Sequence, residues 1–183
     1  MSQKLIVSPD ELRLYSLELG KKVLDFGYRP DLVVGLWRGA ANITLIVHEQ
    51  LRYRHGIDVE STMVETRGYH GDRIQKDILV NPHHIADVAS RIKNGRNRLL
   101  LLDDVVDTGR TFKKVLTALN EALEGRSYES KIASVFYKPE ANQSGIRPDF
   151  WVKETEQWIN FPATLEGLSD DEIRKKGLDP SRI

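Results

Sequence analysis

The chain alternates two kinds of apolar pattern along its length. Short runs of consecutive apolar residues, rich in β-branched types, are typical of strands buried on both faces of a sheet. Longer stretches between them carry apolar residues at three- and four-residue spacing, which is typical of amphipathic helices. The predicted strands are Leu32–Trp37, Val59–Val64, Leu99–Val105, Ile132–Tyr137 and Asp149–Val152.

Local start and stop signals place the helices between these strands. The first predicted helix opens with the capping box Ser8–Glu11, has proline at its first position, and can end at Gly27. The others are a helix after the small residues 38–41, one beginning at Asn81-Pro82, one over Thr111–Leu123, and a short one opened by the capping box Ser169–Glu172.

Strands that alternate with helices predict an α/β fold with a parallel sheet and helices on both faces. No internal repeat, low-complexity tract or linker interrupts the pattern, so we predict one domain over 1–183. Sheets of this kind bind ligands at the carboxyl ends of their strands. The residues that follow the strands are therefore the first candidates for a functional site.

Composition excludes several classes of function. The 27 basic and 27 acidic residues cancel, so no net positive field attracts nucleic acid or an anionic membrane. The chain has no cysteine, which excludes disulfides, thiolate metal sites and cysteine nucleophiles. No apolar run approaches the roughly 18 residues of a membrane span, and Met1–Val7 lacks the apolar core of a signal peptide. We predict a cytoplasmic protein that binds neither nucleic acid nor membrane.

The leucine-rich strand ends in two adjacent acids, Asp103 and Asp104. Adjacent carboxylates repel each other and are costly to bury, so hydroxyl donors or a cation must hold them. The hydroxyl groups of a sugar fit this requirement.

A turn rich in hydrogen-bond donors follows the acids and enters a helix, with the sequence Asp107-Thr108-Gly109-Arg110-Thr111. Gly109 removes the side chain where a ligand would approach. The hydroxyls of Thr108 and Thr111, together with the amides of the helix start, can bind a phosphate. Carboxylates beside a phosphate cradle predict a sugar phosphate as the ligand.

Other nucleotide-binding signatures do not occur. The sequence contains neither G-x-x-x-x-G-K-[ST] nor G-x-G-x-x-G, and these acids are not spaced as the D-x-D of an aspartyl-phosphate phosphatase. The alternative interpretation is that Asp103, Asp104 and Asp107 only cap a helix. One acid is enough for a cap, whereas here three acids coincide with two threonines and a glycine.

The stretch from Leu99 to Thr111 resembles the binding motif for 5-phosphoribosyl-1-pyrophosphate (PRPP) of type I phosphoribosyltransferases: four apolar residues, two acids, two apolar residues, then Asp-Thr-Gly-x-Thr. The resemblance covers about 32–162 and implies a core over those residues, with the N-terminal helix and the C-terminal tail forming a small hood. It implies that Asp103 and Asp104 hold the ribose. Residues 107–111 would then bind the 5′-phosphate.

The end of the first strand, Trp37-Arg38-Gly39, is similar to the pyrophosphate loop of the same family. Arg38 would neutralise the departing pyrophosphate, and Gly39 would let backbone amides approach it. In purine-specific relatives the peptide bond before the basic residue is often cis, which implies a cis Trp37–Arg38 bond. The alternative is an ordinary surface arginine after a strand.

Two segments resemble the base site of the purine branch, xanthine–guanine and hypoxanthine phosphoribosyltransferases. Lys138 follows a strand where that branch has a lysine that donates to the 6-oxygen of the base. In Trp158-Ile159, the tryptophan would stack on the purine and nearby backbone groups would read its edge. Each residue also has an ordinary alternative: a solvated lysine, and a tryptophan of the core or of a dimer contact.

The polar stretch Glu65–Asp77 is predicted to be a mobile loop. By resemblance it is the family's lid, in which only Tyr69 matches the usual Ser-Tyr pair; the alternative is a simple flexible loop. Thr164 and Glu166 are the nearest candidates for an acid that some relatives carry after the aromatic residue. The adjacent His83 and His84 would point about 100° apart on a helix, which does not favour a shared metal ion.

The resemblance implies transfer of a phosphoribosyl group from PRPP to N9 of a 6-oxopurine. Asp107 is the candidate general base and Lys138 the group that stabilises charge on the 6-oxygen. Mg²⁺ is the expected cofactor, bound mainly by pyrophosphate and ribose oxygens, with Asp103 and Asp104 assisting indirectly. The family also implies a homo-oligomer, a dimer or tetramer.

Two alternatives stay open. One is a phosphoribosyltransferase for another base, such as orotate, adenine or uracil. The other is a regulatory protein that binds PRPP without catalysis, which should bring a basic DNA-binding element. A zero net charge and the lack of an added helix-turn-helix domain do not favour it.

Overall fold

The computed structural model describes residues 4–56, 59–70, 73–93, 95–165 and 167–183, without the side chains of 55, 68–70 and 73–77. Its strands are β1 (Lys4–Ile6), β2 (Leu32–Trp37), β3 (Glu60–His70), β4 (Arg73–Val80), β5 (Arg98–Val106), β6 (Glu129–Tyr137), β7 (Phe150–Glu154) and β8 (Trp158–Asn160). Its helices are α1 (Pro9–Asp25), α2 (Ala41–His55), α3 (Pro82–Arg91), α4 (Arg110–Leu123), α5 (Asp170–Lys175) and the 3₁₀ turn Pro180–Arg182. None of the described helices is long and apolar enough to cross a membrane.

The main sheet has six strands in the order β4-β3-β2-β5-β6-β7. Only β4 runs antiparallel to its neighbour, and the other pairs are parallel. Leu32 of β2 lies beside Leu99 of β5, and Gly35 lies beside Leu102. This register brings the carboxyl ends of β2 and β5 together at one edge of the sheet, where the parallel-sheet rule places a ligand.

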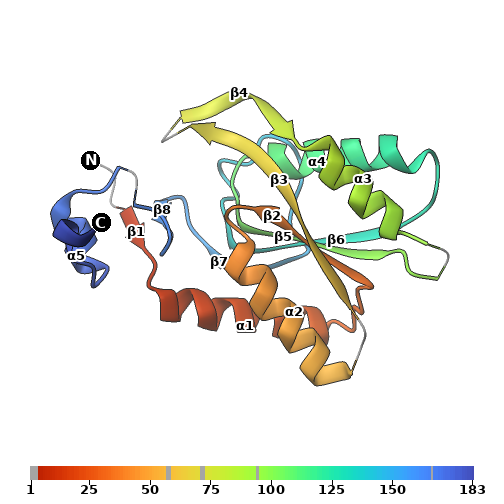
Figure 1. Ribbon diagram of the computed structural model, residues 1–183, viewed down its shortest axis with the longest axis horizontal. Coiled ribbons are helices and arrows are strands. Elements are labelled where there is room, and N and C mark those ends of the chain that lie inside the picture. The colour runs from red at the N-terminus through yellow and green to blue at the C-terminus, as the bar shows by residue number, and fades with distance from the viewer. Residues whose placement is uncertain (1–3, 57–58, 71–72, 94, 166) are drawn as a thin grey trace.

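Helices cover both faces of this sheet, as the alternating pattern predicts (Figure 1). Successive side chains of β5 point to opposite faces: Leu100 and Leu102 join the core beneath α1 and α2, while Leu99 and Leu101 join the core beneath α3 and α4. All four leucines are completely buried. The α/β fold class is therefore confirmed, with a strand buried on both faces at its centre.

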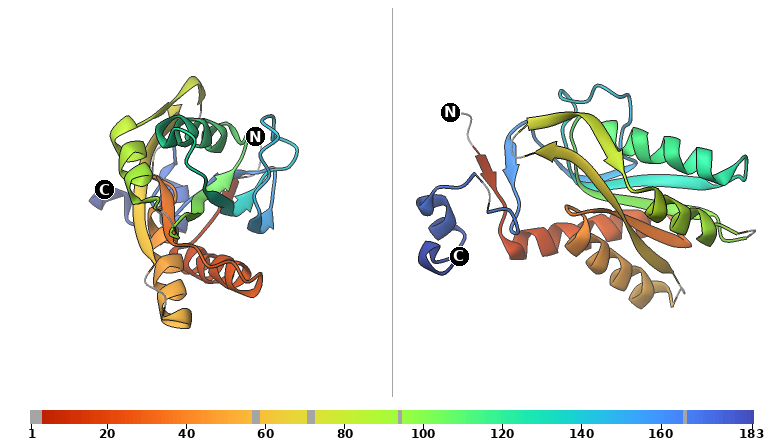
Figure 2. Two further views of the ribbon diagram at one scale, coloured as in Figure 1. Left: turned by 90° about the vertical axis from the view of Figure 1, so that its right-hand side faces the viewer. Right: turned by 45° about the horizontal axis from the view of Figure 1, so that its top comes forward.

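The segment Glu65–Asp77 is not an irregular loop. It forms the greater part of an antiparallel ribbon in which β3 and β4 pair, with Thr66 opposite Val80 and His70 opposite Arg73. Backbone pairing does not depend on the side chains being apolar, so a polar, glycine-containing stretch could form strands that its pattern did not predict. The ribbon extends toward the end of the molecule to which the parallel strands run (Figures 1 and 2).

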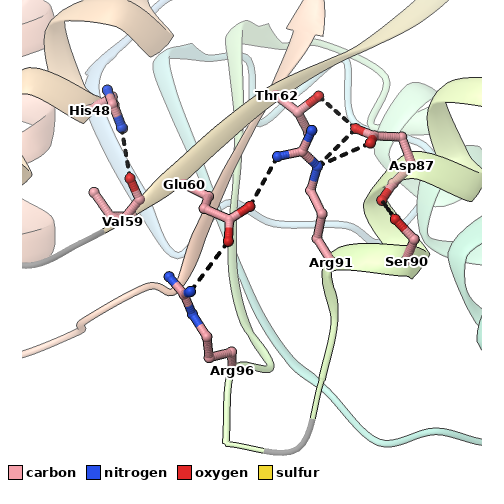
Figure 3. Close-up of polar contacts among 8 residues, drawn as sticks. All are labelled: His48, Val59, Glu60, Thr62, Asp87, Ser90, Arg91 and Arg96. Atoms are coloured by element: carbon pink, nitrogen blue, oxygen red, sulfur yellow. Dashed lines mark hydrogen bonds and ion pairs between the residues drawn. The ribbon is translucent and has the colours of Figure 1, made fainter.

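A network of charged side chains joins β3 to α3 at the amino end of the strands (Figure 3). Arg91 pairs with Asp87 on its own helix and reaches Glu60 on β3, both at 3.0 Å. Thr62 donates to Asp87 at 3.0 Å, and Arg96 lies 3.3 Å from Glu60. Single exposed ion pairs contribute little, but this network holds β3 against α3 at the end opposite the candidate site.

A second, two-stranded sheet pairs the two ends of the chain. β1 lies parallel to β8, with Leu5 beside Ile159, and α5 follows beyond it (Figure 2). The amino-terminal residues of this small sheet are those of β1. Helix α1, which the resemblance assigned to a hood, packs its apolar face, including Leu19 and Val23, into the core of the main sheet.

Candidate functional site

The aspartate pair lies near the carboxyl end of β5, where the strand leaves the core. Both Asp103 and Asp104 are partly buried, and the Asp103 carboxylate accepts the amide of Asp104 at 2.9 Å. Burial, together with the adjacent Asp104 charge, raises the pKa of Asp103 well above its usual value. Burial also raises the pKa of Asp104 to about 6. Two crowded carboxylates favour an incoming ligand that brings hydroxyl donors or a cation.

The loop after β2 lies directly against this pair. The Trp37–Arg38 peptide bond is cis, as the family resemblance implies, and both side chains are exposed. Gly39 touches the acid: a Cβ added there would lie 2.4 Å from one carboxylate oxygen of Asp104 and 2.5 Å from its Cγ. The predicted pyrophosphate loop and the predicted ribose site are therefore parts of one site.

The turn after β5 forms the start of α4. Gly109 has φ +73° and is the N-cap of the helix, so the N-cap residue supplies no side-chain cap to α4. The Thr108 hydroxyl accepts the Arg110 amide at 3.4 Å. A Cβ at this position would lie 2.1 Å from Ser144 Oγ, so glycine is required by both conformation and space. The Thr108 carbonyl accepts hydrogen bonds from the amides of Gln143 and Ser144, so the loop after β6 holds this turn in place.

The helix after β2 has the same feature. Its N-cap is Ala40, which has no side chain able to cap. The other α-helices of the described chain, α1, α3 and α5, are capped by Ser8, Asn81 and Ser169 respectively. The two helices whose N-cap residue supplies no side-chain cap are thus the two that follow the neighbouring strands β2 and β5 at the candidate site. Uncapped amides attract an anion.

Three side chains predicted to hold the base lie close together. Lys138 is 7% exposed, and its ammonium lies 3.5 Å from Asp107 Oδ2. The same ammonium lies 5.8 Å from the centre of the Trp158 ring, within the range of a cation–π contact. The backbone amide of Lys138 donates to Val106 at 2.9 Å, which ties the end of β6 to the end of β5. Lysine, acid and aromatic ring therefore form one cluster.

The strand β8 presents Trp158 and Ile159 differently. The Trp158 side chain is 38% exposed, whereas Ile159 is 8% exposed and belongs to the core beneath α1 and α2. This arrangement suits the predicted roles, an open aromatic ring at Trp158 and a backbone contact at Ile159.

The remaining sequence candidates are placed as follows. Tyr69 lies on β3 by its backbone, but its side chain lies outside the described residues, as does Glu166. Thr164 is exposed, and its carbonyl accepts from Lys176. His84 accepts the amide of Glu65 at 3.0 Å, so this histidine connects α3 to the ribbon.

Comparison with known proteins gives the family. Residues 18–169 match the phosphoribosyl transferase domain family. The chain belongs to this family. It is also 31% identical over 152 residues to the hypoxanthine-guanine phosphoribosyltransferase of Lactococcus lactis, a match that covers 81% of this chain and 74% of the relative.

Solved structures agree on the fold. A purine phosphoribosyltransferase from Pyrococcus horikoshii superimposes with a TM-score of 0.68 at 24% identity, over 91% of this chain and 97% of the other. The xanthine-guanine-hypoxanthine phosphoribosyltransferase of Helicobacter pylori gives 0.66 at 22% identity, over 88% and 92%. The chain therefore has the same fold as these two solved phosphoribosyltransferases.

Two parts of this phosphoribosyltransferase domain escaped sequence reasoning. The segment around Ser144 lies against Gly109 in the turn after β5, and Lys176 of the C-terminal segment contacts the turn after β8. Neither residue belongs to a motif or follows a predicted strand, so no local signal could have identified them.

Proposed function

We propose that this chain transfers the phosphoribosyl group of PRPP to N9 of a 6-oxopurine, hypoxanthine, guanine or xanthine, as a step of purine salvage. The products are the nucleoside 5′-monophosphate and pyrophosphate. The family supports the transferase class, and the relative from Lactococcus lactis supports the purine branch.

One observation carries the PRPP site: helices α2 and α4 both begin at an N-cap residue that supplies no side-chain cap, and the loop before α2 lies against Asp104. The amides of residues 108–111 would bind the 5′-phosphate, and Arg38 with the amides beside Gly39 would bind the pyrophosphate. Asp103 and Asp104 would hold the ribose hydroxyls between them. PRPP carries a phosphate on one side of its ribose and a pyrophosphate on the other, so its charges match two anion sites with carboxylates between them.

The base cluster supports a 6-oxopurine. The 6-oxygen and N7 of such a purine lie on the same edge of the ring. Lys138 would donate to the 6-oxygen while Asp107, 3.5 Å away, takes the proton that the ring loses. Trp158 would stack on the ring face. Adenine presents an amino donor where the 6-oxygen stands, so it would meet the Lys138 ammonium donor to donor.

The reaction forms the bond from purine N9 to C1 of the ribose and breaks the bond from C1 to the pyrophosphate oxygen. The pyrophosphate leaves with the electron pair. Asp103 and Asp104 lie beside the ribose, where their negative charge favours the cationic character that develops on the sugar. Trp158 and Lys138 hold the base in line with the bond that breaks.

Mg²⁺ is the proposed cofactor, and the donor set fits it. Among the described residues, no three His, Asp or Glu side chains gather to hold a metal ion unaided. The two adjacent carboxylates would assist indirectly, through hydrogen bonds or water, while Mg²⁺ would take its oxygen ligands mainly from substrate phosphates, ribose hydroxyls and water. Mg²⁺ bound in this way would neutralise charge on the departing pyrophosphate.

We further propose a cytoplasmic homo-oligomer. The absence of cysteine from the sequence supports a reducing compartment. Leu45 and Tyr53 lie two turns apart on α2 and are 62% and 86% exposed, which supports a contact between copies along that helix.

The test is pyrophosphate release by the purified protein with PRPP, Mg²⁺ and a panel of bases. Release is expected with at least one 6-oxopurine and not with adenine, uracil or orotate. Release with another base alone would overturn the purine assignment, and PRPP binding without release with any base would favour a non-catalytic regulator. In Lys138→Ala, loss of purine binding with PRPP binding retained is expected, and full activity would remove Lys138 from the site.

A further inference from the structure

The turn that follows β8 is contacted by a lysine of the C-terminal segment, in addition to its own hydrogen bond from the Thr164 amide to the Phe161 carbonyl at 3.0 Å. The Lys176 ammonium donates to three backbone carbonyls of this turn: Phe161 at 2.7 Å, Thr164 at 2.5 Å and Pro162 at 3.3 Å. A lysine ammonium has three N–H donors and no acceptor. All three N–H donors of Lys176 can therefore be used by carbonyls of one four-residue turn, whereas a lysine side chain normally extends into solvent.

The turn itself is connected to the base cluster in two ways, both through its first residue, Phe161. It begins immediately after β8, which carries Trp158 and Ile159. The Phe161 ring packs edge-to-face on Phe136 of β6, with ring centres 5.8 Å apart, and β6 ends just before Lys138. A shift of this turn would therefore move the stacking ring relative to the lysine that faces the 6-oxygen.

The C-terminal segment that carries Lys176 is itself held to β1. The Lys4 ammonium on β1 lies 2.9 Å from the Glu172 carboxylate of α5, and donates to the Gly167 carbonyl at 3.3 Å. Hydrogen bonds from Ser169 and then from Lys4 lower the pKa of Glu172 to about 2, so this carboxylate is charged at neutral pH. Lys176 thus follows directly after a helix that β1 holds in place, and its side chain is partly buried.

We propose that Lys176 is a positioning residue for the purine: it fixes the turn 161–164 and through it the orientation of Trp158 and Ile159. The proposal rests on the proposed function, because it assumes that β8 binds the base. It assigns the C-terminal segment a task in the reaction that is exerted through the turn 161–164.

The test compares Lys176→Met with Lys175→Met in the full-length protein. Lys175 is the preceding residue of α5 and is exposed, so its variant controls for loss of one charge from this helix. The purine KM of Lys176→Met is expected to rise about tenfold, because a charged donor is lost from three carbonyls. The KM for PRPP should change less than about twofold, and Lys175→Met should behave like the parent protein.

Hydrogen exchange of the ligand-free protein, followed by mass spectrometry over residues 158–165, is the second readout. Faster exchange there in Lys176→Met alone, with partial restoration in Lys176→Arg, is the expected result. An unchanged purine KM, an equal rise of both KM values, or a lower melting temperature as the sole effect would each overturn the proposal. If the parent protein turns over no base, the proposed function fails and the positioning role fails with it, whereas normal parent turnover with an unaltered variant rejects Lys176 alone.

Discussion

Gly39→Ala introduces one methyl group at the contact between the pyrophosphate loop and the aspartate pair. The added Cβ would lie 2.4 Å and 2.7 Å from the two carboxylate oxygens of Asp104 and 2.5 Å from its Cγ. Non-bonded heavy atoms prefer separations of about 3.5–4.0 Å. The added Cβ would therefore lie about 0.8–1.6 Å too close to these three atoms, and small backbone adjustments cannot remove this overlap.

Asp104 can relieve the overlap by turning away, because its side chain is partly exposed. When PRPP binds, the Asp104 side chain must turn back toward the ribose and against the added methyl group. This costs about as much as overpacking by one methyl group, roughly 1–3 kcal/mol. That range corresponds to a loss of about 5- to 150-fold in kcat/KM for PRPP. Global stability should fall less, because turning Asp104 outward also separates it from Asp103.

The assay is a double-mutant cycle with Gly39→Ala, Asp104→Ala and the double variant, each measured for kcat/KM with PRPP and for unfolding by urea. Asp104→Ala removes the atoms that the new methyl group meets. Adding Gly39→Ala to that background should therefore cost less than about twofold. An equal loss in both backgrounds would show that the methyl group acts elsewhere, and the geometric reasoning would be wrong.

Three further changes test separate parts of the structure. Asp104→Asn should stabilise the ligand-free protein by about 1–3 kcal/mol in urea unfolding at neutral pH, because it removes one of two crowded carboxylates; an unchanged or lower stability would contradict this. Burial raises the pKa of Asp31, but hydrogen bonds from Arg98 outweigh it and hold that pKa below its usual value. Such a carboxylate stabilises the fold above its unfolded pKa and loses this effect as the pH falls. Asp31→Asn should therefore cost about 1–3 kcal/mol at pH 7 and little near about pH 2, measured by thermal unfolding across that range; a cost independent of pH would show that charge is not involved. Trp158→Leu should lower kcat/KM for the purine about 5- to 150-fold through lost stacking and leave the KM for PRPP nearly unchanged, and equal effects on both substrates would argue against stacking.

The sequence by itself determined the elements whose signals are local. The capping boxes at Ser8 and Ser169 form as predicted, with reciprocal hydrogen bonds to Glu11 and Glu172. The leucine run of β5 is buried on both faces, because no other environment suits four consecutive leucines. The Asp-Thr-Gly-Arg-Thr stretch also predicted the start of a helix, and α4 begins within it at Arg110.

Tertiary structure decided what depends on residues far apart in the chain. The Asp107–Lys138 contact, the pairing of β1 with β8, the approach of Gly39 to Asp104 and the hold of Lys176 on the turn at 161–164 all join separate segments. The β3–β4 ribbon belongs here too, since its strands form by mutual backbone pairing. Periodicity and capping report only how a residue relates to its immediate neighbours. The order of the strands in the sheet decides which strand ends lie side by side. The packing of the helices on its two faces then decides which side chains come into contact there.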